Sequence, residues 1–235
     1  MAGMNAQVPE DASTQVEVVR VFTDAAGRFG NQLGLARAGD VAALDKQELA
    51  ARLNFSETAV FEDPVGGVAR VRIYTPTVEL PFAGHPTVGT AWWLGNQGHP
   101  VSRIDVPAGE VAVTETDGLT WITARAEWAP PFTFHELAGP DELRALVPAD
   151  ITEGEHYFWT WTDEARGAVR SRMFAPDLGI AEDEATGAAA VALTALLRRG
   201  LIITQGEGSQ LFTEWDSDGW VRLGGRVAED HAVVL

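Results

Sequence analysis

The feature that most constrains the fold of this chain is an internal repeat with an offset of 100 residues. The segment Arg72–Pro76 (RIYTP) aligns with Arg172–Pro176 (RMFAP). In each copy, a strand-like segment ending in an aromatic residue leads to a proline, a short loop, a turn with glycine and threonine, and an apolar helix. Unless this five-residue match is a coincidence, the repeat predicts two similar domains.

The helices that follow the two copies are predicted to be buried. The first covers about Pro86–Leu94 and stops at Gly95, and the second covers about Thr186–Arg199 and stops at Gly200. Glycine commonly ends a helix in this way. Because both helices are apolar on nearly every side, each belongs inside a structure rather than on its surface. The simplest architecture is a curved sheet wrapped around each central helix.

The rest of the pattern indicates a mixed α/β (α+β) chain. Runs of β-branched and aromatic residues predict strands at Val16–Thr23, Thr58–Glu62, Ala69–Tyr74, Arg103–Val106, Glu110–Glu115 and Leu119–Arg125. A further helix is expected over Asp40–Leu53, with Asp40 as its N-cap. We expect a mobile polar tail over residues 1–15, a first domain over 16–128 that the C-terminal strand can complete, and a second domain over 129–235. The predicted boundary is the segment Ala129–Pro131.

Composition excludes several classes of partner. The chain has 34 acidic and 17 basic residues and a formal charge of −17, so polyanions are repelled and nucleic acid and anionic membranes are poor partners. Cysteine is absent, which excludes disulfides, thiolate metal sites and cysteine catalysis. No apolar stretch approaches the roughly 20 residues that cross a bilayer. We expect a soluble, cytoplasmic protein.

The motifs of common cofactors are not found. Gly206-Glu207-Gly208 lacks the third glycine and the following helix of a dinucleotide fingerprint, and no phosphate-binding loop occurs. Lys46, the only lysine, lies on the polar face of a predicted helix, which disfavours a Schiff base. The five histidines show no metal-ligand spacing. We therefore expect chemistry without metal or cofactor.

Two polar loops precede the apolar helices and are candidates for a binding site. Phe82–Thr87 contains His85, and Glu182–Gly187 contains Asp183. If both helix N-termini point into a cleft between the domains, their dipoles suit a ligand with a carboxylate. Taken alone, His85 is more often a hydrogen-bonded structural histidine, and Asp183 is more often a helix cap.

Glu57 is a third candidate, at the start of an apolar strand. If its side chain points inward, burial raises its pKa and suits it to act as both acid and base near neutral pH. The alternative interpretation is an exposed glutamate that follows a helix.

Five blocks in order resemble the PhzF-like phenazine-biosynthesis isomerases, which have the diaminopimelate-epimerase fold. The blocks are Val21–Asp24 with Phe29–Asn31, Asn54–Thr58, Arg72–Pro76 with Gly84–Pro86, Arg172–Pro176 with Glu182–Gly187, and Gln205-Gly206 with Gly224-Gly225. The resemblance implies two pseudo-symmetric domains, each a β-barrel-like sheet closed around a central helix, with the active site between them.

The resemblance also implies roles for individual residues. Glu57 would be the general acid/base, with His85 and Asp183 assisting proton relay and substrate orientation. The implied substrate-binding positions are Asn31, Ser56, Gly84, Thr186, Gly187 and Ala188, and backbone groups of Gly84, His85 and Gly187 would hold a substrate carboxylate. In such a cleft we expect a net upward shift of the Glu57 pKa. Racemisation by two cysteines, used by the epimerase branch, is excluded.

Four departures from the family pattern concern the substrate. Gln32 and Glu184 stand where the family has proline, and Ala188 where serine often follows Thr-Gly. The late Gly-Arg-Pro-Ser element is replaced by Gly208–Leu211, in which Gln210 occurs and arginine does not. The substrate can therefore differ from the dihydro-hydroxyanthranilate of the phenazine pathway.

These observations predict a cofactor-independent isomerase of secondary metabolism, of the antibiotic-biosynthesis type. It would move a proton between carbons of a small cyclic or conjugated amino or hydroxy acid that carries a carboxylate. The alternatives are a single-base epimerase or hydro-lyase on the same fold, or a non-catalytic small-molecule-binding relative. The joint presence of Glu57, His85 and Asp183 argues against the last. Family habit and eight tryptophans suggest a homodimer.

Overall fold

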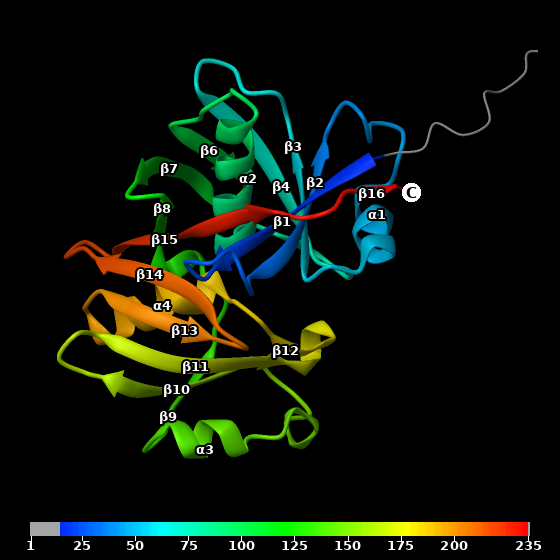
Figure 1. Ribbon diagram of the computed structural model, residues 1–235. Helices are drawn as coiled ribbons and strands as arrows, with labels where there is room; N and C mark the ends of the chain where they lie inside the picture. Colours follow the sequence, from blue (N-terminus) through cyan, green and yellow to red (C-terminus); the bar gives the residue numbers. More distant parts are fainter. Residues whose placement is uncertain (1–14, 235) are drawn as a thin grey trace, which may run out of the picture.

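The structure, a computed structural model, describes residues 15–234, and eight of its strands close into a barrel (Figure 1). Their order is β1, β2, β3, β4, β6, β7, β8 and β15, and β15 pairs with β1 to complete the ring. The bounds are β1 (Gln15–Thr23), β2 (Asn31–Arg37), β3 (Glu57–Phe61), β4 (Val68–Tyr74), β6 (Arg103–Val106), β7 (Gly109–Thr116), β8 (Leu119–Arg125) and β15 (Trp220–Glu229). The strands predicted in this half are confirmed within two residues at each end.

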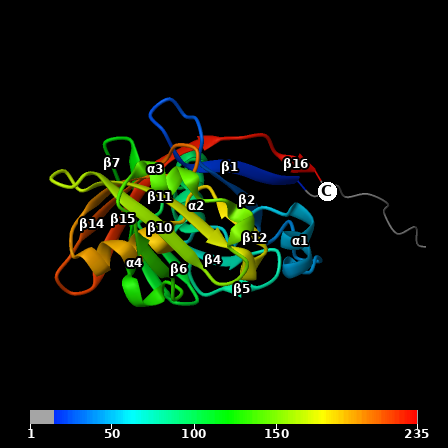
Figure 2. The ribbon, with the colours of Figure 1, turned by 90° about the horizontal axis from the view of Figure 1, so that it is seen from below.

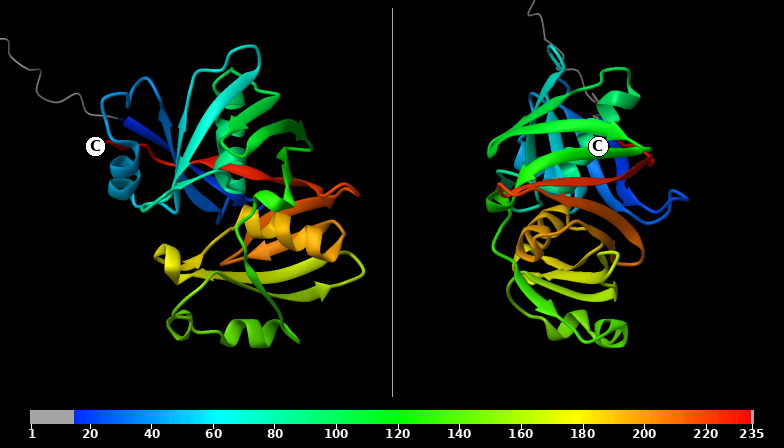
Figure 3. Two further views of the ribbon diagram at one scale, coloured as in Figure 1. Left: turned by 180° about the vertical axis from the view of Figure 1, so that it is seen from behind. Right: turned by 90° about the vertical axis from the view of Figure 1, so that its left-hand side faces the viewer.

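A second sheet continues from β15 on the other side of the barrel wall. It runs β15, β14, β13, β11, β10 and β9, with β12 paired to β11. The bounds are β9 (Thr133–Glu136), β10 (His156–Asp163), β11 (Ala168–Ala175), β12 (Ile180–Asp183), β13 (Leu201–Gln205) and β14 (Ser209–Trp215). Within residues 15–234, β9 pairs only with β10, so this sheet remains open where the first is closed. Figure 3 shows the sheet curving beside helix α4.

Each sheet surrounds one apolar helix, as the repeat predicts. Helix α2 (Gly84–Asn96) packs against β1, β2, β3, β8 and β15, and α4 (Gly187–Leu197) packs against β14 and β15. Val88 of α2 and Val191 of α4 are both 0% exposed, and most residues of both helices are buried. The predicted fold class is confirmed, although between residues 15 and 234 only the first of the two sheets closes into a barrel around its helix.

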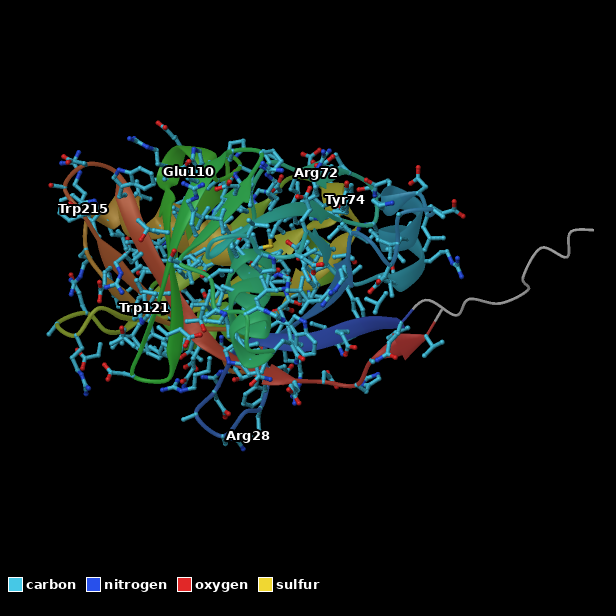
Figure 4. The ribbon with its side chains drawn as sticks, turned by 90° about the horizontal axis from the view of Figure 1, so that it is seen from above. Arg28, Arg72, Tyr74, Glu110, Trp121 and Trp215 are labelled. Carbon is cyan, nitrogen blue, oxygen red and sulfur yellow. The ribbon has the colours of Figure 1, made fainter. Side chains whose placement is uncertain are left out.

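The repeated arginine has the same structural role in both halves. Arg72 of β4 forms a two-point ion pair with Glu79 of β5 (Glu79–Leu80), and Arg172 of β11 forms one with Glu182 of β12 at 2.7 and 2.8 Å. In each case the short strand pairs antiparallel with the strand that carries the arginine. Arg72 lies at the edge of the molecule beside Tyr74 (Figure 4). The repeat is therefore a repeat of structure as well as of sequence.

The helix predicted over Asp40–Leu53 begins later than expected. Helix α1 spans Lys46–Leu53, and its N-cap is Asp45, whose side chain accepts a hydrogen bond from the Glu48 N–H. The prediction of Asp40 as N-cap is wrong. The preceding residues form turns instead, and the Lys46 ammonium donates to three of their carbonyl oxygens, those of Val41, Ala42 and Leu44. These carbonyls are satisfied without a helix.

Shorter elements complete the described part of the chain. They are α3 (Pro140–Ala145), β16 (Val233–Val234) and the 3₁₀ turns η1 (Ala126–Trp128), η2 (Pro148–Asp150) and η3 (Pro176–Leu178). β16 pairs with the first residues of β1, which places the two ends of the described chain together (Figure 2). The tail predicted over residues 1–15 lies outside the described residues, apart from Gln15 in β1. Between residues 15 and 234, no helix has the length and apolarity needed to span a membrane.

Candidate active site

Three ionisable side chains converge where the two central helices begin. Glu57 is the first residue of β3, His85 lies in the first turn of α2, and Asp183 is the last residue of β12. The side chains of Glu57 and His85 are 16% and 2% exposed, and Asp183 is 7% exposed. Helix α1 ends just before Glu57 with Asn54 in the left-handed conformation, which turns the chain into β3. The alternative of a solvent-exposed Glu57 is wrong.

His85 contacts an acceptor with each ring nitrogen. Its Nδ1 lies 3.1 Å from Oε2 of Glu57, and its Nε2 lies 3.2 Å from the backbone oxygen of Gln32. A neutral imidazole carries only one N–H, so two acceptors favour the doubly protonated ring. Burial lowers the pKa of His85, but the charges of Glu57 and Asp183 outweigh it, and the net pKa is raised. The contacts of both nitrogens thus favour an imidazolium paired with the Glu57 carboxylate.

Asp183 is held by two side-chain donors. Its Oδ1 accepts from Nδ2 of Asn31 at 2.6 Å, and its Oδ2 accepts from Oγ1 of Thr186 at 2.5 Å. Burial and the nearby charge of Glu57 nevertheless raise the pKa of Asp183 to about 7. This carboxyl is thus present in both protonation states near neutral pH.

The expected upward shift of the Glu57 pKa is wrong. Burial does raise it, but the charge and hydrogen bonding of His85, together with Ser56, more than compensate, and the net pKa lies below its usual value. The pKa values of two neighbouring acids are thereby driven apart: that of Glu57 is lowered, and that of Asp183 is raised to about 7. Paired acids whose pKa values are driven apart are typical of acid/base sites.

Gln205 is also part of the site, although the sequence predicted it only as a member of one of the family-like blocks. It is 0% exposed, and its Nε2 donates to Oγ1 of Thr186 at 2.8 Å and to the backbone oxygen of Asp183 at 3.0 Å. Its Oε1 accepts from the Tyr157 hydroxyl at 3.1 Å and from the Thr186 N–H at 3.2 Å. The available signal was an amide at the end of an apolar strand, directly before Gly206.

The helix N-termini touch one another through glycine. A Cβ on Gly84 would lie 3.0 Å from the Cα of Gly187 and 2.6 Å from a methyl of Leu223, and Gly187 has the reciprocal contacts. A side chain at either position would force the helices apart. The predicted residues Gly84 and Gly187 thus set the approach of α2 and α4, while their neighbours Ala83, Thr186 and Ala188 line a cavity.

That cavity, of about 180 Å³, lies between the two sheets. Its apolar wall includes Leu80, Phe82, Trp128, Phe132, Met173 and Ile180. Its ionisable wall consists of Glu57, Glu155 and Asp183. Such a chamber, mostly apolar with a few polar groups, suits a small ring that carries polar substituents.

The other two predicted substrate-binding residues lie behind the acids. Ser56 donates to Oδ1 of Asn31 at 3.1 Å, and Asn31 in turn donates to Asp183. Both residues line a separate open depression with Gln32 and Glu184. Their contacts orient Asp183 rather than face the cavity between the sheets.

As for metals, no group of three or more histidine or acidic side chains within residues 15–234 could hold an ion.

The fold recurs in solved structures with low sequence identity. A phenazine biosynthesis protein of the PhzF family from Bacillus anthracis matches with a TM-score of 0.75 at 18% identity, over 96% of this chain and 99% of that one. A hydroxyproline epimerase from Agrobacterium vitis matches with a TM-score of 0.64 at 12% identity, over 97% and 94%. These matches show that the chain has the diaminopimelate-epimerase-like fold.

Sequence comparison identifies the family within that class. The profile of the family described as phenazine biosynthesis-like protein (PhzC-PhzF) matches residues 19–149 and 142–219. The trans-2,3-dihydro-3-hydroxyanthranilate isomerase of Pseudomonas fluorescens is 33% identical over 69% of this chain and 72% of its own length. The enzyme of the same name from Pseudomonas aeruginosa is 31% identical, over 68% and 71%. This chain belongs to the PhzC-PhzF family, and it is an isomerase.

Proposed function

We propose that this isomerase moves a proton between two carbons of a small cyclic or conjugated amino or hydroxy acid, without a cofactor. Glu57 is the general acid/base in this proposal. The observation that carries it is the pairing of an ionised Glu57, stabilised by His85, with an Asp183 carboxyl of pKa about 7 at the same cavity. One group can accept a proton while its neighbour can donate one.

In the proposed reaction, the Glu57 carboxylate removes a proton from an acidified C–H bond. The electron pair of that bond enters the conjugated system and shifts a double bond, and Glu57 returns the proton to a second carbon. No atom is gained or lost. The imidazolium of His85 favours the ionised form of Glu57 before and after the transfer, and the protonated form of Asp183 donates to the oxygen on which negative charge develops.

The substrate class rests on the cavity and on the relatives. Three aromatic side chains, Phe82, Trp128 and Phe132, line the chamber, which suits a flat ring. The relatives named above act on trans-2,3-dihydro-3-hydroxyanthranilate, and we propose a compound of that kind, within secondary metabolism. Ala188 places a methyl group at the cavity wall where many family members have serine, so a substrate carboxylate would rely on the helix N-termini.

Replacement of Glu57 by glutamine tests the proposal. Glu57→Gln keeps the shape of the side chain but cannot accept the proton, so we expect turnover to fall at least about 10²-fold. The measurement is carbon-bound deuterium, followed by NMR, when the protein is incubated with cyclic dihydro amino and hydroxy acids in deuterated water. Glu62→Gln removes the same charge from an exposed position just after β3 and should leave the rate unchanged.

The products of the same incubation separate the alternatives. Inversion at one carbon would indicate an epimerase, and loss of water would indicate a hydro-lyase. Tight binding without any exchange would favour a non-catalytic relative. Turnover of Glu57→Gln at nearly the wild-type rate would contradict the assigned role of Glu57.

A further inference from the structure

One carboxylate at the cavity has no role in the proton transfer just described. Glu155 immediately precedes β10 and lines the cavity together with residues of both sheets. Its backbone oxygen accepts from the Thr133 N–H at 2.9 Å, which anchors the segment to β9. The side chain therefore projects from a fixed stretch of backbone.

The Oε2 atom of Glu155 is buried and has no hydrogen-bond partner among residues 15–234. Oε2 of Glu57 likewise makes no hydrogen bond, but it lies 3.1 Å from Nδ1 of His85 and so has an ion-pair partner, and Asp183 accepts from Asn31 and Thr186. Buried polar atoms in proteins are nearly always satisfied, so an unpaired one calls for a partner such as a water, an ion or a ligand atom. A ligand atom in this cavity can supply the missing partner.

The surroundings of Glu155 favour a cationic partner. The residues that line the cavity include three acids and no arginine, lysine or histidine. Burial and the neighbouring charge of Asp177 both raise the pKa of Glu155, as expected for a carboxylate with no cation beside it. An ammonium group would supply both that charge and the hydrogen-bond donor.

The rest of the cavity indicates what carries the ammonium group. The rings of Phe82 and Trp128 lie 5.6 Å apart between centroids, and Phe132 belongs to the same wall. These side chains favour a compact ring over an extended chain. The cavity thus suits a small ring whose ammonium group reaches Glu155.

We propose that Glu155 determines specificity by binding the protonated amino group of the substrate, so that the protein selects ring acids that carry an amino group over ring acids that lack one. This inference rests on the proposed function in that it places the substrate in the cavity beside Glu57. It concerns recognition only, and no proton transfer to carbon involves Glu155.

Equilibrium titration with unreactive ring acids tests the inference. The probes are trans-2-aminocyclohexanecarboxylate, trans-2-hydroxycyclohexanecarboxylate and cyclohexanecarboxylate, measured by calorimetry near neutral pH. We expect the wild-type protein to bind the amino compound about tenfold or more tightly than the other two, as a charge-assisted hydrogen bond implies. Glu155→Gln should abolish this preference.

Glu153→Gln is the matched control, because Glu153 is exposed, lies two residues away and loses the same charge. It should keep the preference. If the wild type binds the hydroxy compound as tightly as the amino compound, or if Glu155→Gln retains the preference, the inference is wrong. The probes lack the conjugated double bond that acidifies the substrate C–H, and their binding is measured at equilibrium, so failure of the Glu57→Gln experiment would affect only the proposed function.

Discussion

At the scale of single residues, His85 controls the charge of the site. Its two nitrogens face the carboxylate of Glu57 and the carbonyl oxygen of Gln32, so the ring is held in one orientation and favours two protons. The sequence around Glu57 could not by itself predict the direction of its pKa shift. Burial alone raises the pKa, but His85, which belongs to another element, lowers it by a larger amount.

His85→Gln tests this control. Glutamine cannot carry the charge that keeps Glu57 ionised, so the pKa of Glu57 should rise and the acidic limb of the kcat/KM profile should move up by about one pH unit or more. The measurement is the pH dependence of proton exchange. His99→Gln changes an exposed histidine and serves as the control. An unshifted acidic limb in His85→Gln would contradict the ion pair.

Asp183 should affect stability as well as chemistry. Its pKa is raised from 3.8 to about 7 on folding, so its stabilising contribution is complete below the lower value and is lost as the pH rises through the higher one. Asp183→Asn is free of this loss. Relative to wild type, its free energy of unfolding should increase by on the order of 2–4 kcal/mol between about pH 4 and pH 8.

Urea unfolding at several pH values measures this difference. Asp218→Asn, at an exposed position in the loop before β15, should show no such trend. A difference between Asp183→Asn and wild type that does not depend on pH would mean that Asp183 titrates normally in the folded protein.

At the scale of elements, a helix or strand could be predicted where the apolar residues of a single segment already have the spacing of that element. The strand at Leu119–Arg125 and the buried helix α2 are of this kind. It failed at Asp40, because two aspartates precede the same apolar stretch, and the choice between them depends on how Lys46 binds the preceding carbonyls. Gln205 was missed because its partners come from β10, β12 and the start of α4.

The two arginines of the repeat occupy matched positions on β4 and β11, and their variants can be compared directly. Arg172 is 15% exposed and also donates to the backbone oxygens of Leu143 and Leu146, whereas Arg72 is 61% exposed. Arg172→Gln should therefore lower the free energy of unfolding by about 2–3 kcal/mol, and Arg72→Gln by less than about 1 kcal/mol. Urea unfolding of both variants provides the comparison. Equal losses would show that burial does not distinguish the two ion pairs.

At the scale of the whole molecule, we propose that the chain forms a homodimer, as family habit suggests. Light scattering after size exclusion should then give a mass of about twice the 25.2 kDa of the chain. A mass of one chain across the micromolar range would contradict the proposal. Trp215, labelled in Figure 4, is 38% exposed, and its fluorescence should change on dilution if it lies in the interface.

The strand β15 has a consequence for how the protein is made. It is the eighth strand of the first barrel, yet it follows every other barrel strand by almost a hundred residues of the second sheet (Figure 1). A ribosome therefore releases seven of the barrel strands, with their apolar faces around α2, long before the strand that closes them. The nascent chain must hold an unclosed barrel, with β1 and β8 as free edges, until residues 220–229 emerge. Such edges pair readily with other chains, so an unclosed barrel is open to aggregation during this interval.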